Sequence, residues 1–187
     1  TLYDSAGREV SYQSKQTYAA ASSSAGFTPP ATPTDMIIIE GSATKTLRII
    51  SFCVQATATA GITSRFQLVK RSAADTTGTF VAATQVPLDS ANNAGSANRV
   101  GHFTANPGAL GTAVGNVWSG LKRVGEVGAA ATNTFSENPD TVPFVGDSLL
   151  DQPVTLRGVA QCLALNFNGA ALPAAMLVNY TIVWIEE

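Results

Sequence analysis

Charged residues are scarce in this chain. Only 13% of its 187 residues are Asp, Glu, Lys or Arg, and the formal net charge is −2. Because ordinary soluble domains carry roughly a quarter charged residues, we expect much of this surface to face other protein. The nearly neutral balance gives no support for binding to a phosphate backbone, so no nucleic-acid partner is expected.

Histidine, cysteine and long apolar runs are also rare. The single histidine, His102, offers little material for a Ser-His-acid triad, and Ser119 lacks the first glycine of a nucleophile elbow. Cys53 and Cys162 have no closely spaced metal-binding partners; we expect two small buried side chains, and a disulfide between them stays open. No run of about 18 apolar residues predicts a membrane span. The chain is not expected to be an enzyme, and we predict no cofactor, metal, small-molecule substrate or membrane partner.

From residue 35 onward, the sequence patterns are those of β-strands. Apolar and polar residues alternate in 45–59 and 63–72, and the last run, 175–186, is apolar on both faces, which is typical of a central strand. In 154–167 a strong strand pattern is interrupted by Gly158, which predicts a bulge or a bend. Shorter candidates lie at 36–40, 79–86, 97–104 and 112–119. With turn-forming clusters between these runs, the sequence predicts an all-β jelly-roll sandwich of about eight strands over residues 35–187.

Residues 1–34 lack a sustained apolar period and are predicted to form an extended N-terminal arm. Three prolines between residues 29 and 33 make its end stiff. Ordering such an arm costs about 1 kcal/mol per residue, so its aromatic residues must find pockets on its own domain or on a neighbour. Its charges sum to zero, which favours contact with protein over contact with DNA. The candidate interface residues in the arm are Tyr3, Tyr12, Tyr18, Phe27, Pro29 and Pro30.

Charges of opposite sign are separated along the chain. Residues 41–74 contain basic residues and no acid, whereas residues 135–151 contain four acids and no base. These two stretches either pair, within or between subunits, or form two solvated faces. Lys70 and Arg71, at the end of the basic stretch, are added to the candidate interface residues.

Several segments resemble a family of small phage virion proteins, the jelly-roll cement (decoration) proteins of tailed-phage capsids. The resemblance covers about residues 26–187 and rests on GFTPPATPTDMIIIEGSATKTLRI, QLVKRSAADTTGT, FTANPGALGTAVG and VTLRGVAQCLALNFNGAALPAAMLVNYTIVWIEE. It implies a homotrimer on the exterior of the capsid that bridges neighbouring major capsid proteins and is made in the host cytoplasm. The quoted segments are turns and strand edges and include no catalytic signature.

Two other readings stay open. A receptor-binding sandwich of the phage tail or fibre would need an exposed aromatic platform for sugar, and Trp118 and Trp184 are the only tryptophans. Trp184 lies on the apolar face of the last strand run and is expected to be buried. The other reading, an enzyme, lacks a constellation of catalytic residues.

Overall fold

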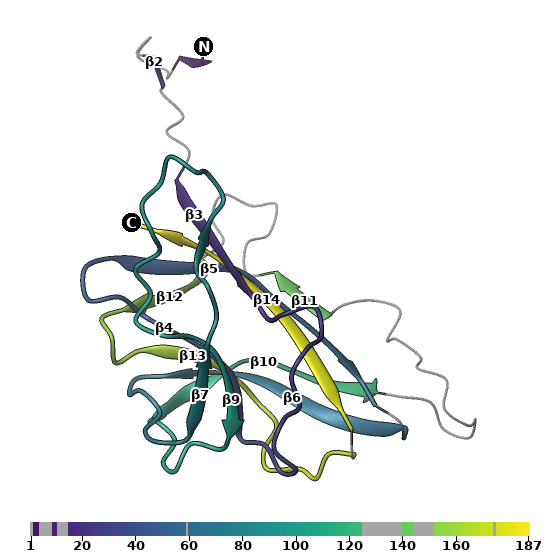
Figure 1. The fold of residues 1–187 in the computed structure, drawn as a ribbon. Coiled ribbons are helices and arrows are strands. Elements are labelled where there is room, and N and C mark those ends of the chain that lie inside the picture. Colours follow the sequence, from purple (N-terminus) through teal and green to yellow (C-terminus); the bar gives the residue numbers. More distant parts are fainter. Residues whose placement is uncertain are drawn as a thin grey trace.

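The computed structural model describes residues 2–3, 9–10, 15–58, 60–124, 140–143, 152–173 and 175–187. In these residues the regular secondary structure is entirely β, as the sequence predicts (Figure 1). Two six-stranded antiparallel sheets pack face to face, and a separate pair is formed by β1 (Leu2–Tyr3) and β2 (Glu9–Val10). The described part of the chain contains no helix that is long and apolar enough to cross a membrane.

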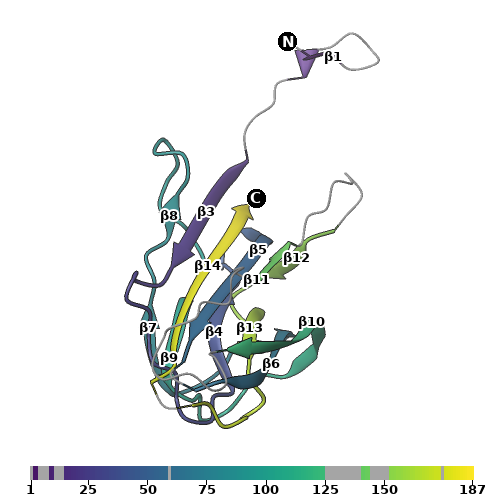
Figure 2. The ribbon, with the colours of Figure 1, turned by 90° about the vertical axis from the view of Figure 1, so that its right-hand side faces the viewer.

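The first sheet contains the first and the last strand of the sandwich along the chain. Its strand order is β11-β5-β14-β3-β8, and β12 also pairs with β5 (Figure 2). The strands are β3 (Gln16–Ala21), β5 (Thr46–Thr57), β8 (Val86–Pro87), β11 (Asp140–Pro143), β12 (Val154–Arg157) and β14 (Leu177–Glu186). The prediction that the last strand is central is confirmed, because β14 lies between β5 and β3.

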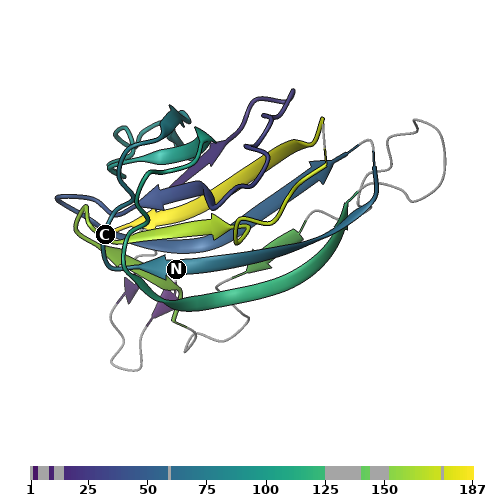
Figure 3. The same cartoon turned by 90° about the horizontal axis from the view of Figure 1, so that it is seen from below.

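The second sheet has the order β10-β6-β13-β4-β9-β7. Its strands are β4 (Asp35–Glu40), β6 (Ile62–Arg71), β7 (Thr79–Ala82), β9 (Val100–Ala105), β10 (Ala113–Val124) and β13 (Cys162–Asn166). The long β10 is the outermost strand on its side of this sheet and follows β6 along most of its length (Figure 3). The described strands therefore outnumber the eight or so that we predicted.

The main core fills the space between the two sheets. Along β14, Val178, Tyr180, Ile182 and Trp184 point inward and are buried, while the residues between them are more exposed. This is the period of two that a strand with one face in a core requires. Each of these large side chains contributes roughly 1.5–3 kcal/mol through apolar area removed from water.

The predicted boundary at residue 35 is wrong, because the sandwich begins at β3. This strand pairs with β14 from Gln16 to Ala21, and Tyr18 stacks on Trp184 inside the core with a ring-centroid distance of 5.8 Å. Alanine is a weak strand former, so the alternation of Tyr18 and Ala20 gives only a weak strand pattern in the sequence.

The proline segment also belongs to the sandwich. Three backbone hydrogen bonds tie it to the turn after β13: Phe167 N–H to Thr34 O, Gly169 N–H to Pro33 O and Leu172 N–H to Ala31 O. The side chain of Asn106 binds it from another direction, with Nδ2 donating to Thr32 O and Oδ1 accepting from Thr34 N–H. The segment is therefore fixed to one end of the sandwich by its own chain.

Gly158 bends the chain, as predicted. The run 154–167 is divided into β12 and β13, which belong to different sheets. Gly158 lies between them with φ of 70°, a left-handed conformation that side chains other than glycine adopt at a cost. One apparent strand in the sequence thus supplies a strand to each layer.

Candidate functional site

The face of the second sheet that points away from the first sheet is here called the outer face, and its central part is buried. Ile37 and Ile39 of β4 pack into the main core, whereas Ile38 between them belongs to a separate buried cluster with Phe103 and Ala164. Because neighbouring residues of a strand point to opposite faces, this second cluster lies on the outer face. A layer of loops must therefore cover the sheet there.

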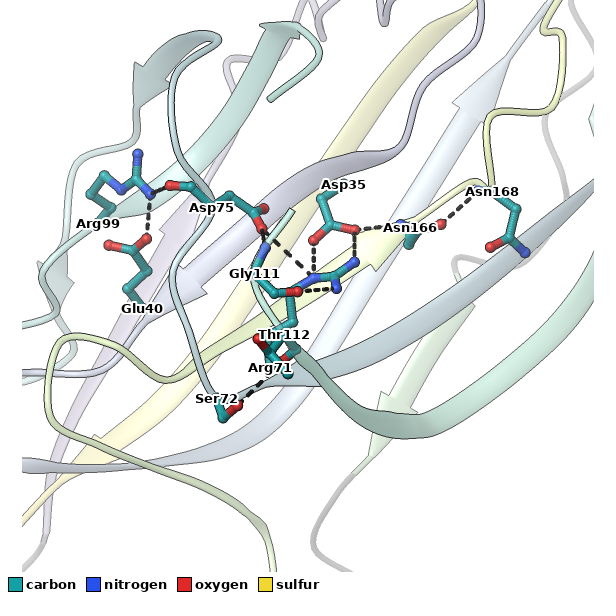
Figure 4. A network of polar contacts seen from close by, with 10 residues as sticks. All are labelled: Asp35, Glu40, Arg71, Ser72, Asp75, Arg99, Gly111, Thr112, Asn166 and Asn168. Atoms are coloured by element: carbon teal, nitrogen blue, oxygen red, sulfur yellow. Dashed lines mark hydrogen bonds and ion pairs between the residues drawn. The ribbon is translucent and has the colours of Figure 1, made fainter. Parts of the chain in front are cut away.

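Two loops form this layer, and together we call them the cover: residues 72–78 after β6 and residues 106–112 before β10. Backbone hydrogen bonds join the two loops, from Ser72 N–H to Thr112 O (2.9 Å), from Thr76 N–H to Ala109 O (3.0 Å) and from Gly108 N–H to Thr76 O (3.1 Å). The cover is attached to the outer face by a network of buried charges (Figure 4).

Asp35 enters this network because of an irregularity in β4. The register passes from Leu165↔Ile37 to Asn166↔Asp35, so that Met36 has no partner on β13. Such a bulge re-aims the side chains beside it: Met36 packs in the main core, and Asp35 accepts a hydrogen bond from Asn166 Nδ2. Asp35 is fully buried.

Arg71 connects Asp35 to the cover. Its Nε donates to Asp35 Oδ2 and its Nη2 donates to Asp35 Oδ1 at 2.8 Å, while Nη1 donates to the backbone oxygen of Gly111 at 2.7 Å. Burial alone would lower the pKa of Arg71, but the pair with Asp35 outweighs burial and raises this pKa. The guanidinium group stays charged and holds β4, β6 and the cover together.

A second ion pair lies next to the first. Glu40, at the other end of β4, is fully buried and accepts hydrogen bonds from Arg99 Nη2 and from Asn98 Nδ2 (2.7 Å). Arg99 Nη2 also donates to the backbone oxygen of Asp75 in the cover, at 2.7 Å. Hydrogen bonding to Glu40 raises the pKa of Arg99 against the opposing effect of burial.

The buried charges of the outer face contact one another, so the network is an internal connection between the sheet and the cover. Among the residues that the structure describes, no group of three or more His, Cys, Asp or Glu side chains is placed to hold a metal ion. Cys162, also on this face, is a free buried thiol, and burial raises its pKa.

His102 lies in the main core, as a satisfied core histidine would. Its ring stacks on Phe27 with a centroid distance of 3.9 Å, and its Nδ1 lies 3.3 Å from the hydroxyl of Tyr180. Burial lowers the pKa of His102 and raises that of Tyr180 to about 12. Both groups are therefore neutral at pH 7.

The surface that stands out is the free edge of β10. This strand pairs with β6 on one side, and no other described strand pairs with it. No Asp, Glu, Lys or Arg occurs from residue 100 to residue 121, and Val114, Val117 and Leu121 are 64%, 41% and 67% exposed. Register irregularities fall at Val114 and Val117, so the regular part of the ladder runs from Trp118 onward.

A shallow hollow lies on the same two strands. It has a volume of about 420 Å³ and is lined by Arg65, Phe66, Gln67, Ser119, Gly120 and Leu121. Trp118 packs against the main core and partly against Gly120, where an added Cβ would lie 2.6 Å from its ring. The hollow therefore offers a backbone-rich surface without an aromatic platform.

The structure places most of the predicted interface residues inside the subunit. Tyr18, Phe27 and Pro29 are buried in their own domain, and Arg71 is buried against Asp35. The interface prediction is wrong for these four, because their side chains are already covered by their own chain.

The remaining predicted residues are only partly accounted for. Pro30 and Lys70 are half-buried. Tyr3 is described only as part of β1, and Tyr12 lies outside the described residues. The acids of 135–151 lie outside them as well, apart from Asp140 in β11, and the basic Arg48 pairs with Glu187.

The sequence reading missed Asp35, Glu40, Asp75 and the edge of β10. The sequence does contain one signal for Asp35 and Glu40. The run DMIIIE places acids at both ends of a strand without polar alternation, and a charge in a wholly buried strand must be paired.

Comparisons with protein-family models, with curated proteins and with solved structures find no match to this chain.

Proposed function

We propose that this chain is a structural protein of a tailed-phage virion: a jelly-roll cement protein that binds the outside of the capsid as a homotrimer and bridges neighbouring major capsid proteins. In this proposal it is not an enzyme and needs no cofactor. The resemblance of residues 26–187 to the jelly-roll cement proteins is one support. The strand order and the free edge of β10 are two more.

The strand order supports the jelly-roll part of the proposal. A jelly roll places its strands first, last, third and sixth in one sheet and second, seventh, fourth and fifth in the other, as two Greek keys. With β3 counted as the first strand, the sheets here contain the runs β3-β14-β5-β12 and β4-β13-β6-β10 in this arrangement. The strands β7, β8 and β9 are then an insertion between the fourth and fifth strands that extends both sheets on one side.

The free edge of β10 is the observation that carries the assembly role. A long edge strand with exposed apolar residues is a site for pairing with another chain, and proteins that must stay apart protect such edges with lysine, proline or short strands. Here the bulges protect the first part of the strand, and Lys122 and Arg123 lie near its end. The regular, uncharged part from Trp118 to Leu121 remains available between them. We propose that this edge and its apolar side chains contact the major capsid protein.

The receptor-binding alternative receives no support from the tryptophans. Trp184 is fully buried in the main core, and Trp118 packs against that core. Sugar-binding surfaces present a fully exposed aromatic face, whereas Trp118 is partly buried and Trp184 is fully buried.

The test is co-sedimentation with capsids assembled without this protein. We expect Val117→Lys and Leu121→Lys each to weaken binding at least about tenfold, because each places a charge in an apolar contact worth roughly 1.5 kcal/mol or more. Val159→Lys is the matched control, since Val159 is 43% exposed and lies in the turn between β12 and β13. Binding should depend only mildly on salt, because apolar contacts are not screened.

Two results would contradict the proposal. Equal binding of all three variants would remove the β10 edge from the contact. A wild-type protein that light scattering shows to be a monomer, both at micromolar concentration and after release from the particle, would contradict the trimer. If Val117→Lys and Leu121→Lys dissociate the trimer, the edge is a contact between subunits.

A further inference from the structure

The buried network contains more acid than base. Asp35, Asp75 and Glu40 are buried, and the cations that face them are Arg71 and Arg99. Arg99 pairs with Glu40, and Arg71 binds both oxygens of Asp35. Asp75 is left with a contact of 3.7 Å between its Oδ1 and Arg71 Nε.

The two oxygens of Asp75 are not used equally. Oδ1 accepts a hydrogen bond of 2.8 Å from the backbone N–H of Gly111, across the two loops of the cover. Oδ2 is buried and has no hydrogen-bond partner. A buried carboxylate oxygen without a donor costs several kcal/mol, and a proton on Oδ2 would remove that cost together with the unmatched charge.

Among the residues that the structure describes, none supplies a second cation to Asp75. Strand β4 contributes Asp35 and Glu40, β6 contributes Arg71, and the residue before β9, Arg99, reaches the backbone oxygen of Asp75 with its charge already matched by Glu40. Strand β13 contributes the neutral thiol of Cys162. The loop 106–112 contributes the Gly111 amide and no titratable side chain.

We propose that Asp75 is protonated in the folded protein and that the loss of this proton to solvent at neutral to alkaline pH loosens the cover. The direction of the pKa agrees with this geometry. Burial and then the negative charge of Asp35 raise the pKa of Asp75, the Gly111 amide and Arg71 lower it, and the net result is a pKa of about 7. The proposal concerns the cover itself and does not rest on the proposed function.

The sign of the pH effect follows from linkage. The folded state keeps a proton that the unfolded state releases above its ordinary pKa of 3.8. Between about pH 4 and pH 7 the contribution of Asp75 to stability therefore falls as pH rises, and above pH 7 it stays at its lowest value. One linked proton makes the unfolding equilibrium constant rise by up to about tenfold per pH unit in this window.

The matched variant is Asp75→Asn, in which a neutral amide replaces the carboxyl group and its oxygen can accept from the Gly111 amide as a protonated Asp75 would. Urea unfolding of both proteins at pH 5 and pH 8 isolates the contribution of Asp75 to the free energy of unfolding. The unfolding constant of the wild type, divided by that of this variant, should rise roughly a hundredfold from pH 5 to pH 8. An unchanged ratio would overturn the proposal.

Two measurements on the wild type test the proton and the cover directly, and stand even if the variant fails to fold. Carboxyl ¹³C NMR should show a buried aspartate that titrates near pH 7; ordinary titration of all aspartates near pH 4 would overturn the proposal. Hydrogen-exchange protection, corrected for intrinsic rates, should fall from pH 6 to pH 8 at the amides of Ser72, Thr76 and Gly111. Unchanged protection at these three amides would show that the cover does not respond to this proton.

Discussion

Replacing Tyr18 with alanine tests whether β3 belongs to the folding unit of the sandwich. Tyr18 is 1% exposed and stacks on the fully buried Trp184, with an interplanar angle of 21°. On the opposite side of β3, the two-residue β8 depends on this strand for its pairing. The substitution should therefore destabilise the whole domain, although the residue lies in a segment that resembles a linker in the sequence.

The magnitude follows from the contacts. Truncation of a buried aromatic side chain to alanine costs about 3–5 kcal/mol through lost transfer free energy and the cavity left behind, and the stacked pair accounts for about 0.5–1.5 kcal/mol of this total. Since a domain of this kind is stable by roughly 5–15 kcal/mol, we expect a loss of about a fifth or more of the free energy of unfolding.

The assay is urea unfolding followed by tryptophan fluorescence, which reports on Trp118 and Trp184. Tyr18→Phe retains the ring and should stay within about 1 kcal/mol of the wild type. Lys15→Ala, just before β3, removes an exposed pair with Glu187 and should cost less than about 1 kcal/mol. If Tyr18→Ala changes the free energy of unfolding by less than about 1 kcal/mol, β3 is not part of the cooperative unit, and the reasoning from its pairing is wrong.

Two further predictions concern the network and the cover. Arg71→Met should cost about 3–5 kcal/mol in urea unfolding at pH 7, because it leaves the buried Asp35 without its cation; a cost below about 1 kcal/mol would show that Asp35 is compensated elsewhere. Gly111→Ala should cost at least about 2 kcal/mol, because an added Cβ would lie 1.7 Å from the backbone oxygen of Ala73. Gly115→Ala, where a Cβ meets nothing within 4 Å, is the control and should change stability by less than about 0.5 kcal/mol; equal effects at both glycines would contradict the packing of the cover.

The strands that the sequence predicts well are those whose pattern is local. In β5 and β14, large apolar side chains alternate with polar or smaller ones, so the period of two is visible within a single run. The pattern of β3 is hidden because alanine occupies both inward and outward positions. In 154–167 the sequence shows where the chain bends, at Gly158, but which sheet each half joins depends on pairing with β5 and β4, far away in the chain.

The local sequence does not predict the network either, because its partners lie far apart in the chain. Asp35 binds Arg71 and Asn166, which are 36 and 131 residues away, and the spacing in the sequence encodes neither distance. Asp75 lies in the turn-like run RSAADTTG, where an aspartate is ordinarily solvated. Only the register of β4 against β13, with its bulge at Met36, and the layer of loops above them turn these residues into a buried cluster.

The network makes the scarcity of charge in this chain more pronounced at its surface. Five of its charged side chains, those of Asp35, Glu40, Arg71, Asp75 and Arg99, contact one another between the outer face and the cover. The surface is therefore poorer in charge than the composition indicates. Strand β10 lies at the edge of the same sheet, and it carries no charge before Lys122 and Arg123. This is the physical reason to look for its partner along β10 and not around a cavity.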